Sequence, residues 1–209
     1  MPTDPPAAPL DSTYEKSVFL NVPYDQPYAR LLPALIAGLV ALGRIPRCAL
    51  EIHGGARLDQ IHDLIANCRS SINDLSRVTL SGPFRVPRFN MPFELGIAFS
   101  LAKTAGHRIY LFEAKERLLQ SGLSDMNGYD AEVHGGSPDK IIDSILDWFA
   151  VPGSAPAPAK LRSLDRRLFQ VAKEAQRERG LEDPFKADIF RRLVVAATEL
   201  AREEGLRAR

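Results

Sequence analysis

One glutamate stands alone in an apolar segment and is the strongest candidate for chemistry. Between Arg88 and Lys103 the sequence reads F-N-M-P-F-E-L-G-I-A-F-S-L-A, and Glu94 is its only ionisable residue. The pattern predicts a helix that is apolar nearly all round and therefore buried. A buried carboxylate is unfavourable unless it is paired or used. Glu94 is therefore either a nucleophile or electrostatic catalyst at a cationic centre, or a first-turn residue that backbone amides or an arginine satisfy.

Further polar residues follow the predicted strands. Asp74 is a candidate to hold a ribose hydroxyl or to protonate a leaving base, and the alternative is a loop-capping role. Glu51 ends the second predicted strand and is a candidate substrate contact. Asn21 and Tyr24 close the first strand, where Asn21 suits a sugar or phosphate and Tyr24 suits stacking on a base. The alternative for both is turn formation in N-V-P-Y-D.

Three arginines flank the loop before the Glu94 helix. Arg77, Arg85 and Arg88 are able to bind phosphate through two hydrogen bonds each, and the alternative is a solvated surface position. Asn90 is expected to cap the helix and to line the same substrate site.

Short apolar runs alternate with helical patterns over residues 17–150. Strands are expected at residues 17–21, 47–50, 71–75 and 108–112. Helices are expected at residues 26–42, over the apolar stripe from Leu58 to Cys68, from Asn90 to about Lys103, and over the stripe from Ile141 to Phe149. This alternation predicts a mostly parallel sheet with helices on both faces. Ligands of such sheets bind beyond the carboxyl ends of the strands, which would gather residues 21–25, 51–55, 74–77 and the loop before Asn90 around one crevice.

Two proline-rich segments divide the chain. Residues 1–16 are expected to be a disordered tail, 17–150 the α/β domain, and 151–159 (V-P-G-S-A-P-A-P-A) a linker. Residues 160–209 predict a pair of helices, the first ending at Gly180 and the second beginning at Asp183-Pro184. Their apolar stripes must pack on the body or on a second copy, so a homo-oligomer through these helices is expected.

Composition excludes several classes of protein. Lys and Arg number 27 and Asp and Glu number 26, a net charge of +1, so a nucleic-acid partner is not expected. Cys48 and Cys68 make neither a disulfide framework nor a metal site, and the four histidines are scattered without ligand spacing. The longest apolar stretch is too short to span a membrane and a signal peptide is not recognisable, so a cytoplasmic location is expected. Glycine-rich nucleotide loops of the P-loop and dehydrogenase kinds are missing too.

Three segments resemble known proteins. The sequences P-R-C-A-L-E (residues 46–51), I-N-D-L-S-R (72–77) and P-R-F-N-M-P-F-E-L-G (87–96) look like those of a group of bacterial TIR-like proteins. They are also similar to nucleoside 2-deoxyribosyltransferases, whose helix carries a catalytic glutamate within E-L-G-x-A. The resemblance spans about residues 17–150 and implies a flavodoxin-like (TIR-like) three-layer sandwich. It implies attack on an N-glycosidic bond, with Glu94 matching the catalytic glutamate and Asp74 the upstream aspartate.

The resemblance leaves three functions open. The first is hydrolysis of the N-glycosidic bond of NAD or a related nucleotide, with NAD as substrate and no cofactor. The second is nucleoside 2-deoxyribosyl transfer, from whose pattern residues 89–93 depart because a second Asp and a Gly-Thr are usual there. The third is a non-catalytic module that binds a nucleotide or assembles. Nicotinamide leaves NAD as a neutral base from a cationic ground state, so one carboxylate suffices, and this favours the first function.

Overall fold

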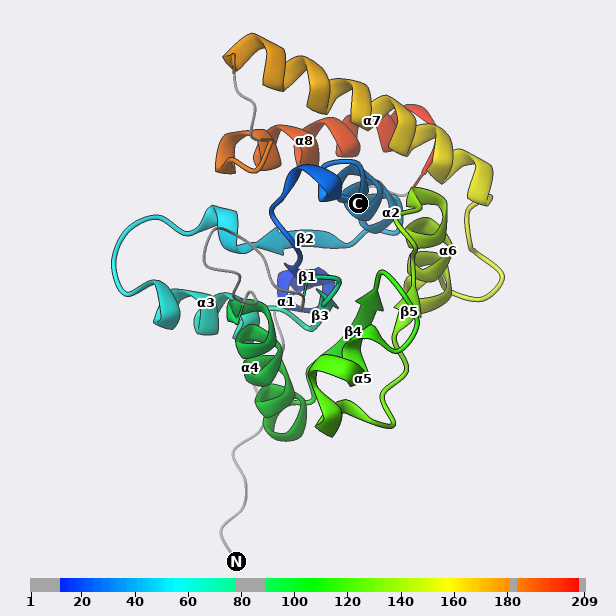
Figure 1. Ribbon diagram of the computed structural model, residues 1–209. Coiled ribbons are helices and arrows are strands. Elements are labelled where there is room, and N and C mark those ends of the chain that lie inside the picture. The colour runs from blue at the N-terminus through cyan, green and yellow to red at the C-terminus, as the bar shows by residue number, and fades with distance from the viewer. Residues whose placement is uncertain (1–11, 78–88, 181–183, 207–209) are drawn as a thin grey trace, which may run out of the picture.

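The structure is a computed structural model that describes residues 12–77, 89–180 and 184–206 of the chain. These residues form a sheet of five parallel strands in the order β2-β1-β3-β4-β5 (Figure 1). The strands are β1 (Ser17–Asn21), β2 (Ile45–Cys48), β3 (Ser70–Asp74), β4 (Arg108–Glu113) and β5 (Glu132–Val133). The expected α/β architecture with a parallel sheet is confirmed, and the strand order is consistent with a flavodoxin-like layered fold.

Helices cover both faces of the sheet. The described residues form eight α-helices: α1 (Ser12–Lys16), α2 (Leu31–Ala41), α3 (Arg57–Ala66), α4 (Asn90–Ala105), α5 (Leu118–Gly122), α6 (Pro138–Phe149), α7 (Pro158–Arg179) and α8 (Ala187–Glu203). Short 3-10 helices are η1 (Gln26–Tyr28), η2 (Ala49–Glu51) and η3 (Ser124–Met126). Figure 1 shows α3 and α4 on one face of the sheet, α2 and α6 on the other, and α7 and α8 outside α2.

The sheet separates two cores because side chains alternate along each strand. In β1, Val18 and Leu20 belong to the core that contains α2 and α6, whereas Phe19 packs with Ile65 of α3 and Ala98 of α4. All five residues of β1 and of β3 are buried, as expected for the inner strands of a parallel sheet that is covered on both faces.

The C-terminal helices share a core with the α/β body. All 11 residues of α2 are buried, because α7 and α8 pack on the side of α2 that faces away from the sheet. Arg30, just before α2, donates to both carboxylate oxygens of Asp165 in α7, and the Nη1–Oδ1 distance is 2.6 Å. A helix that is apolar on every side must be covered on every side, so α7 and α8 complete the body rather than forming a separate unit.

Several expected boundaries differ from those observed. Residues 12–16, expected in a disordered tail, form α1, and the Tyr14 carbonyl accepts from the Arg69 N–H at 3.1 Å. The helix expected at 26–42 is divided into η1 and α2, and Pro33 falls in the first turn of α2, where proline removes no helical hydrogen bond. The second strand begins at Ile45 and ends at Cys48, each two residues earlier than expected, and it ends there because Ala49–Glu51 forms η2.

The C-terminal boundaries also shift. The proline-rich segment is non-helical as far as Ala157, and Pro158 is already the first residue of α7. Gly180 ends α7 in the left-handed conformation with φ of 59°, as its sequence position predicts. The second helix starts at Ala187, three residues after the expected Pro184, and Asp183 lies outside the described residues.

Two expectations about α4 are wrong. The helix is not buried all round: Met91, Glu94, Leu95 and Ala98 are buried, whereas Phe93 is 54% exposed. It forms part of an outer layer, so only one side contacts the sheet. Asn90 is an exposed first residue of the helix and makes no side-chain cap.

Candidate functional site

The first turn of α4 is attached to the carboxyl ends of β1 and β3. Asn21, the last residue of β1, is 2% exposed. Its Nδ2 donates to the Met91 carbonyl at 2.8 Å and to Asn73 Oδ1 at 3.1 Å. The strand order reverses between β1 and β3, the place where open α/β sheets bind ligands. Asn21 therefore holds α4 at this switch point, and its amide is already occupied by protein acceptors.

Glu94 is a buried carboxyl group to which no other described residue bonds. It follows Met91 by one helical turn and is 7% exposed. Within the described residues no side chain or backbone group makes a hydrogen bond or ion pair with it. Burial raises the pKa of Glu94 from about 4.5 to about 7, and the charge of Arg57 opposes the rise. At neutral pH the group is thus available both as an anion and as an acid.

Tyr24 lies in the electrostatic environment of Glu94. Burial raises the pKa of Tyr24 well above its ordinary value, and the charges of Cys48 and Glu94 raise it further. The Tyr24 ring also contacts Phe185, just before α8, at 5.5 Å between centroids and 47° between planes. The predicted stacking residue is therefore held partly by the C-terminal region, which sequence reasoning did not connect with the site.

Asp74 lies in a buried polar cluster of its own, and its hydrogen-bond partners do not include Glu94. It is fully buried. Its Oδ2 accepts from the Tyr28 hydroxyl at 2.7 Å and lies 3.1 Å from His134 Nε2, and its Oδ1 accepts from the Ser76 N–H at 2.9 Å.

The cluster determines the ionisation of Asp74. Burial alone would raise its pKa, but the hydrogen bonds that it accepts from His134, Ser76 and Tyr28 outweigh burial and lower the pKa. His134 Nδ1 accepts from the Gly136 N–H at 2.9 Å, which places the proton of a neutral ring on Nε2, toward Asp74. An ionised, occupied Asp74 is unsuited to protonate a leaving base, so the structure opposes that expected role.

Arg77 joins the loop that follows β3 to the loop that follows β1. Its Nε donates to Asp25 Oδ2 at 2.8 Å, and this bond raises the pKa of Arg77. The guanidinium is about 30% exposed, so it can still meet a ligand from its open side. Arg85 and Arg88 lie outside the described residues.

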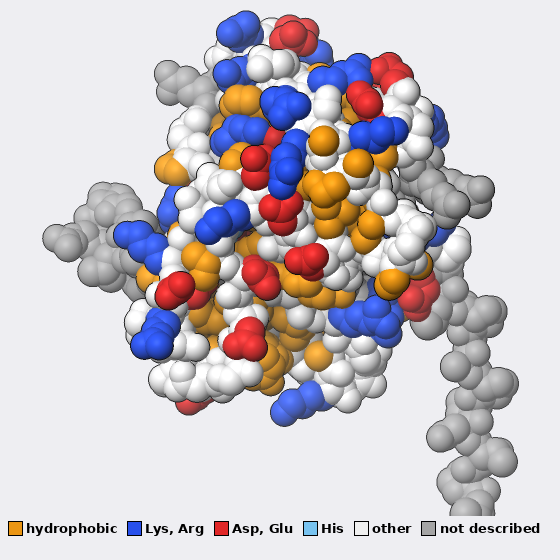
Figure 2. Space-filling view, turned by 90° about the vertical axis from the view of Figure 1, so that its right-hand side faces the viewer, with side chains coloured by type: hydrophobic (Ala, Val, Ile, Leu, Met, Phe, Trp, Pro, Cys, Tyr) orange, Lys and Arg blue, Asp and Glu red, His pale blue; other side chains and the backbone are white. Residues whose placement is uncertain are grey.

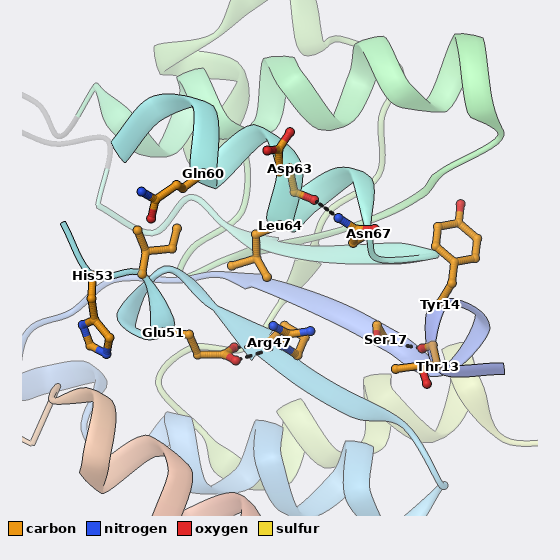
Figure 3. A pocket seen from close by; sticks show the side chains of 11 residues that line it. Thr13, Tyr14, Ser17, Arg47, Glu51, His53, Gln60, Asp63, Leu64 and Asn67 are labelled. Carbon is orange, nitrogen blue, oxygen red and sulfur yellow. Dashed lines mark hydrogen bonds and ion pairs between the residues drawn. The ribbon is translucent and has the colours of Figure 1, made fainter. Parts of the chain in front are cut away.

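Glu51 belongs to a different cavity. Figure 3 shows it paired with Arg47 on the β2 side of a groove whose opposite wall is α3, with Gln60, Asp63 and Asn67. The groove has a volume of about 680 Å³. Glu51 accepts from Arg47 Nε at 2.9 Å and from the Cys48 N–H at 2.8 Å, so it stabilises the end of β2. The structure does not bring Glu51 together with Glu94, and Glu94 lines neither this groove nor three further cavities between described residues.

A second buried cluster was missed by sequence reasoning. His107 donates from Nδ1 to the Cys68 carbonyl and accepts at Nε2 from Ser71 Oγ, both at 2.9 Å. Ser71 Oγ accepts from Asn73 Nδ2 at 2.9 Å, and Asn73 in turn accepts from Asn21. The sequence signal for this cluster is the segment S-S-I-N-D of β3, because a central strand with more polar than apolar side chains needs buried partners for them.

Over residues 12–77, 89–180 and 184–206, no group of three or more His, Cys, Asp or Glu side chains is placed to hold a metal ion. Over the same residues, no helix combines the length and apolar character that a membrane span requires.

Comparison of the chain with protein-family models, with curated proteins and with solved structures gives no match. The site must therefore be interpreted from its own geometry.

Proposed function

We propose that the protein hydrolyses the N-glycosidic bond of NAD or a related nucleotide, with Glu94 as the carboxylate at the anomeric carbon. The observation that carries this proposal is Glu94 itself: it is 7% exposed, has no bonded partner among the described residues, and lies at the switch point of the sheet. An unpaired buried carboxylate is unfavourable for folding, and such groups gather at functional sites.

The reaction needs little from the protein beyond this carboxylate. The C1′–N bond of the nicotinamide riboside breaks, and its electron pair moves to the ring nitrogen, which becomes neutral. The positive charge that develops at C1′ is stabilised by the Glu94 carboxylate or captured by it as a covalent adduct. Water then adds at C1′ and loses a proton, so the products are nicotinamide, ADP-ribose and one proton.

The environment of Asp74 supports NAD, whose leaving group departs from a cationic ground state, as the substrate in preference to a neutral nucleoside. Transfer from a purine or pyrimidine deoxynucleoside requires an acid to protonate the departing base. The natural candidate, Asp74, is fully buried and its pKa is lowered. Nucleoside 2-deoxyribosyl transfer is therefore the weaker proposal, although the resemblance to both groups of proteins is compatible with the parallel sheet.

The loops that follow β1 and β3 supply binding groups for a nucleotide. Arg77 keeps an open side for a phosphate, and Tyr24 offers a ring whose hydroxyl is close enough to Glu94 to respond to its charge. A TIR-like version of the flavodoxin-like fold, a homo-oligomer through α7 and α8, and a cytoplasmic location remain predictions. The inner faces of α7 and α8 already pack on α2.

The experiment is to incubate the purified chain with NAD and to quantify nicotinamide and ADP-ribose by chromatography. Glu94→Gln should lower nicotinamide release by about 100-fold or more, because the replacement cannot carry negative charge. Glu199→Gln is the matched control, since Glu199 is exposed on α8. Equal release by wild type and Glu94→Gln would contradict the proposal. NAD binding without release would favour a non-catalytic nucleotide-binding module.

A further inference from the structure

Strand β4 has an open outer edge over its first residues. β5 pairs only with Phe112 and Glu113 of β4. Among the described strands, none pairs with residues 108–111 on that side. An uncovered stretch of strand edge offers backbone donors and acceptors to an incoming strand.

The backbone of Ile109 faces this edge. In a parallel sheet the directions of the backbone groups alternate along a strand. The Arg108 N–H donates to the Arg69 carbonyl beside β3 at 3.1 Å, whereas the Glu113 carbonyl accepts from the His134 N–H beside β5 at 3.1 Å. Ile109 lies an even number of residues before Glu113, so its backbone groups point to the same side as those of Glu113. The N–H and C=O of Ile109 therefore point toward the open edge.

Aromatic rings form the walls of a groove along the same edge. The groove has a volume of about 500 Å³ and lies between the C-terminal half of α4 and Trp148 of α6. Tyr110 and Trp148 stack at 4.9 Å between centroids and 25° between planes, and Phe99 meets Tyr129 edge-on at 4.9 Å. Tyr129 is 47% exposed. Such rings supply apolar area and bind cations over their faces.

The charge of the groove is negative. Asp130 and Glu132 line it together with Lys103, a balance of −1, and burial lowers the pKa of His107, so that ring adds no charge at neutral pH. Among the described residues neither carboxylate makes an ion pair. Figure 2, which faces the β5 side of the molecule, shows acidic side chains between hydrophobic ones in the middle of this face.

We propose that this groove docks an extended, arginine-containing segment of a partner protein, which adds to the sheet as a strand beside Ile109. Strand addition satisfies the backbone groups of the edge, and alternate side chains of the segment point toward α4 and α6. A guanidinium stacks on aromatic rings and donates to carboxylates, so it fits the lining provided by Tyr110, Trp148, Asp130 and Glu132.

A second copy of the chain fits this edge less well. A two-fold symmetric pairing of β4 with β4 brings identical surfaces together. It would place the carboxylates of Asp130 and Glu132 from both copies along the same interface, where like charges repel. Charge complementarity therefore favours a basic partner.

Trp148 gives a direct readout because it is the single tryptophan of the chain and lines the groove. The probe is the peptide acetyl-Val-Arg-Val-Arg-Val-amide, titrated into the full chain while Trp148 fluorescence is recorded. The matched control peptide carries citrulline, a neutral isostere of arginine, at both arginine positions. We expect a saturable change with the arginine peptide and at least about tenfold weaker binding of the citrulline peptide.

The variant Asp130→Asn/Glu132→Gln should weaken binding of the arginine peptide by about tenfold or more, as expected for loss of charge-assisted hydrogen bonds. The matched variant Asp59→Asn/Glu199→Gln removes two exposed carboxylates elsewhere and should leave binding unchanged. Absence of any fluorescence change up to millimolar peptide would overturn the proposal, as would equal binding of the two peptides. Sedimentation of the wild-type chain as a dimer that Ile109→Pro dissociates, because proline removes the N–H at this edge, and that the arginine peptide fails to dissociate would assign the edge to a second copy and also overturn the proposal.

Discussion

The side-chain Nδ2 of Asn21 lies 2.8 Å from the carbonyl oxygen of Met91 and so joins the end of β1 to the first turn of α4. Glu94 stands one turn further along the same helix. The orientation of the candidate catalytic carboxylate thus depends on the buried side-chain amide of Asn21.

Asn21→Ala is expected to lower both stability and activity. The change leaves the Met91 carbonyl and Asn73 Oδ1 without their donor, at a cost of about 2–4 kcal/mol in the free energy of unfolding for the two buried acceptors. Denaturant unfolding measures this cost, and nicotinamide release at saturating NAD should fall as α4 shifts. Asn127→Ala, at an exposed position, is the control and should change neither quantity.

Glu94→Gln is expected to stabilise the protein above pH 7. The folded-state pKa of Glu94 is raised to about 7, so the folded chain binds more protons than the unfolded chain between about pH 4.5 and 7. The contribution of Glu94 to the free energy of unfolding is therefore fully present below pH 4.5 and is lost as the pH rises through 7. A shift of about 2.5 units corresponds to about 3 kcal/mol. Unfolding at pH 8 should show a gain of about 1–3 kcal/mol in the variant, and at pH 4 the gain should vanish.

Arg57→Gln should raise the pKa of Glu94 further, because the guanidinium charge opposes the effect of burial. Carbon-13 NMR of glutamate carboxyl groups follows this titration without any assay of activity. Arg191→Gln, on the exposed side of α8, serves as the control. An unchanged or lower Glu94 pKa in Arg57→Gln would contradict the assigned electrostatic environment.

Asp74→Asn should destabilise the fold without altering the titration of Glu94. The lowered pKa of Asp74 means that its contribution to stability is present above its ordinary pKa and is lost as the pH falls. Breaking a buried hydrogen-bonded charge cluster with His134 and Tyr28 costs about 3 kcal/mol. Thermal or denaturant unfolding at pH 7 measures the loss, and Asp147→Asn, at an exposed position, should show none. A changed pKa of Glu94 in the Asp74→Asn variant would contradict this prediction and would show that Asp74 belongs to the same site as Glu94.

Local patterns predicted four of the five strands and the candidate glutamate, whereas the two-residue edge strand β5 was not predicted. Val18, Phe19 and Leu20 marked a buried strand, and Gly180 marked the end of a helix, because each signal depends on residues next to one another. Glu94 stood out because its neighbours in the chain are apolar, and the structure indeed buries it.

Contacts between distant residues were beyond the sequence patterns. Arg30 and Asp165 are 135 residues apart, and neither position suggests the other. The partners of Asp74 come from η1 and from the residues after β5, so sequence position alone did not show that its oxygens are occupied. The all-apolar character of α2 was the one local sign that α7 and α8 must cover it.

The most direct test of the account is the rate of nicotinamide release from NAD as a function of pH. We predict that kcat/KM rises with pH through a single apparent pKa near 7, as the Glu94 carboxylate forms, and that Glu94→Gln lowers this release by about 100-fold or more. Release that falls across this range, or that persists in Glu94→Gln at the wild-type rate, would contradict it.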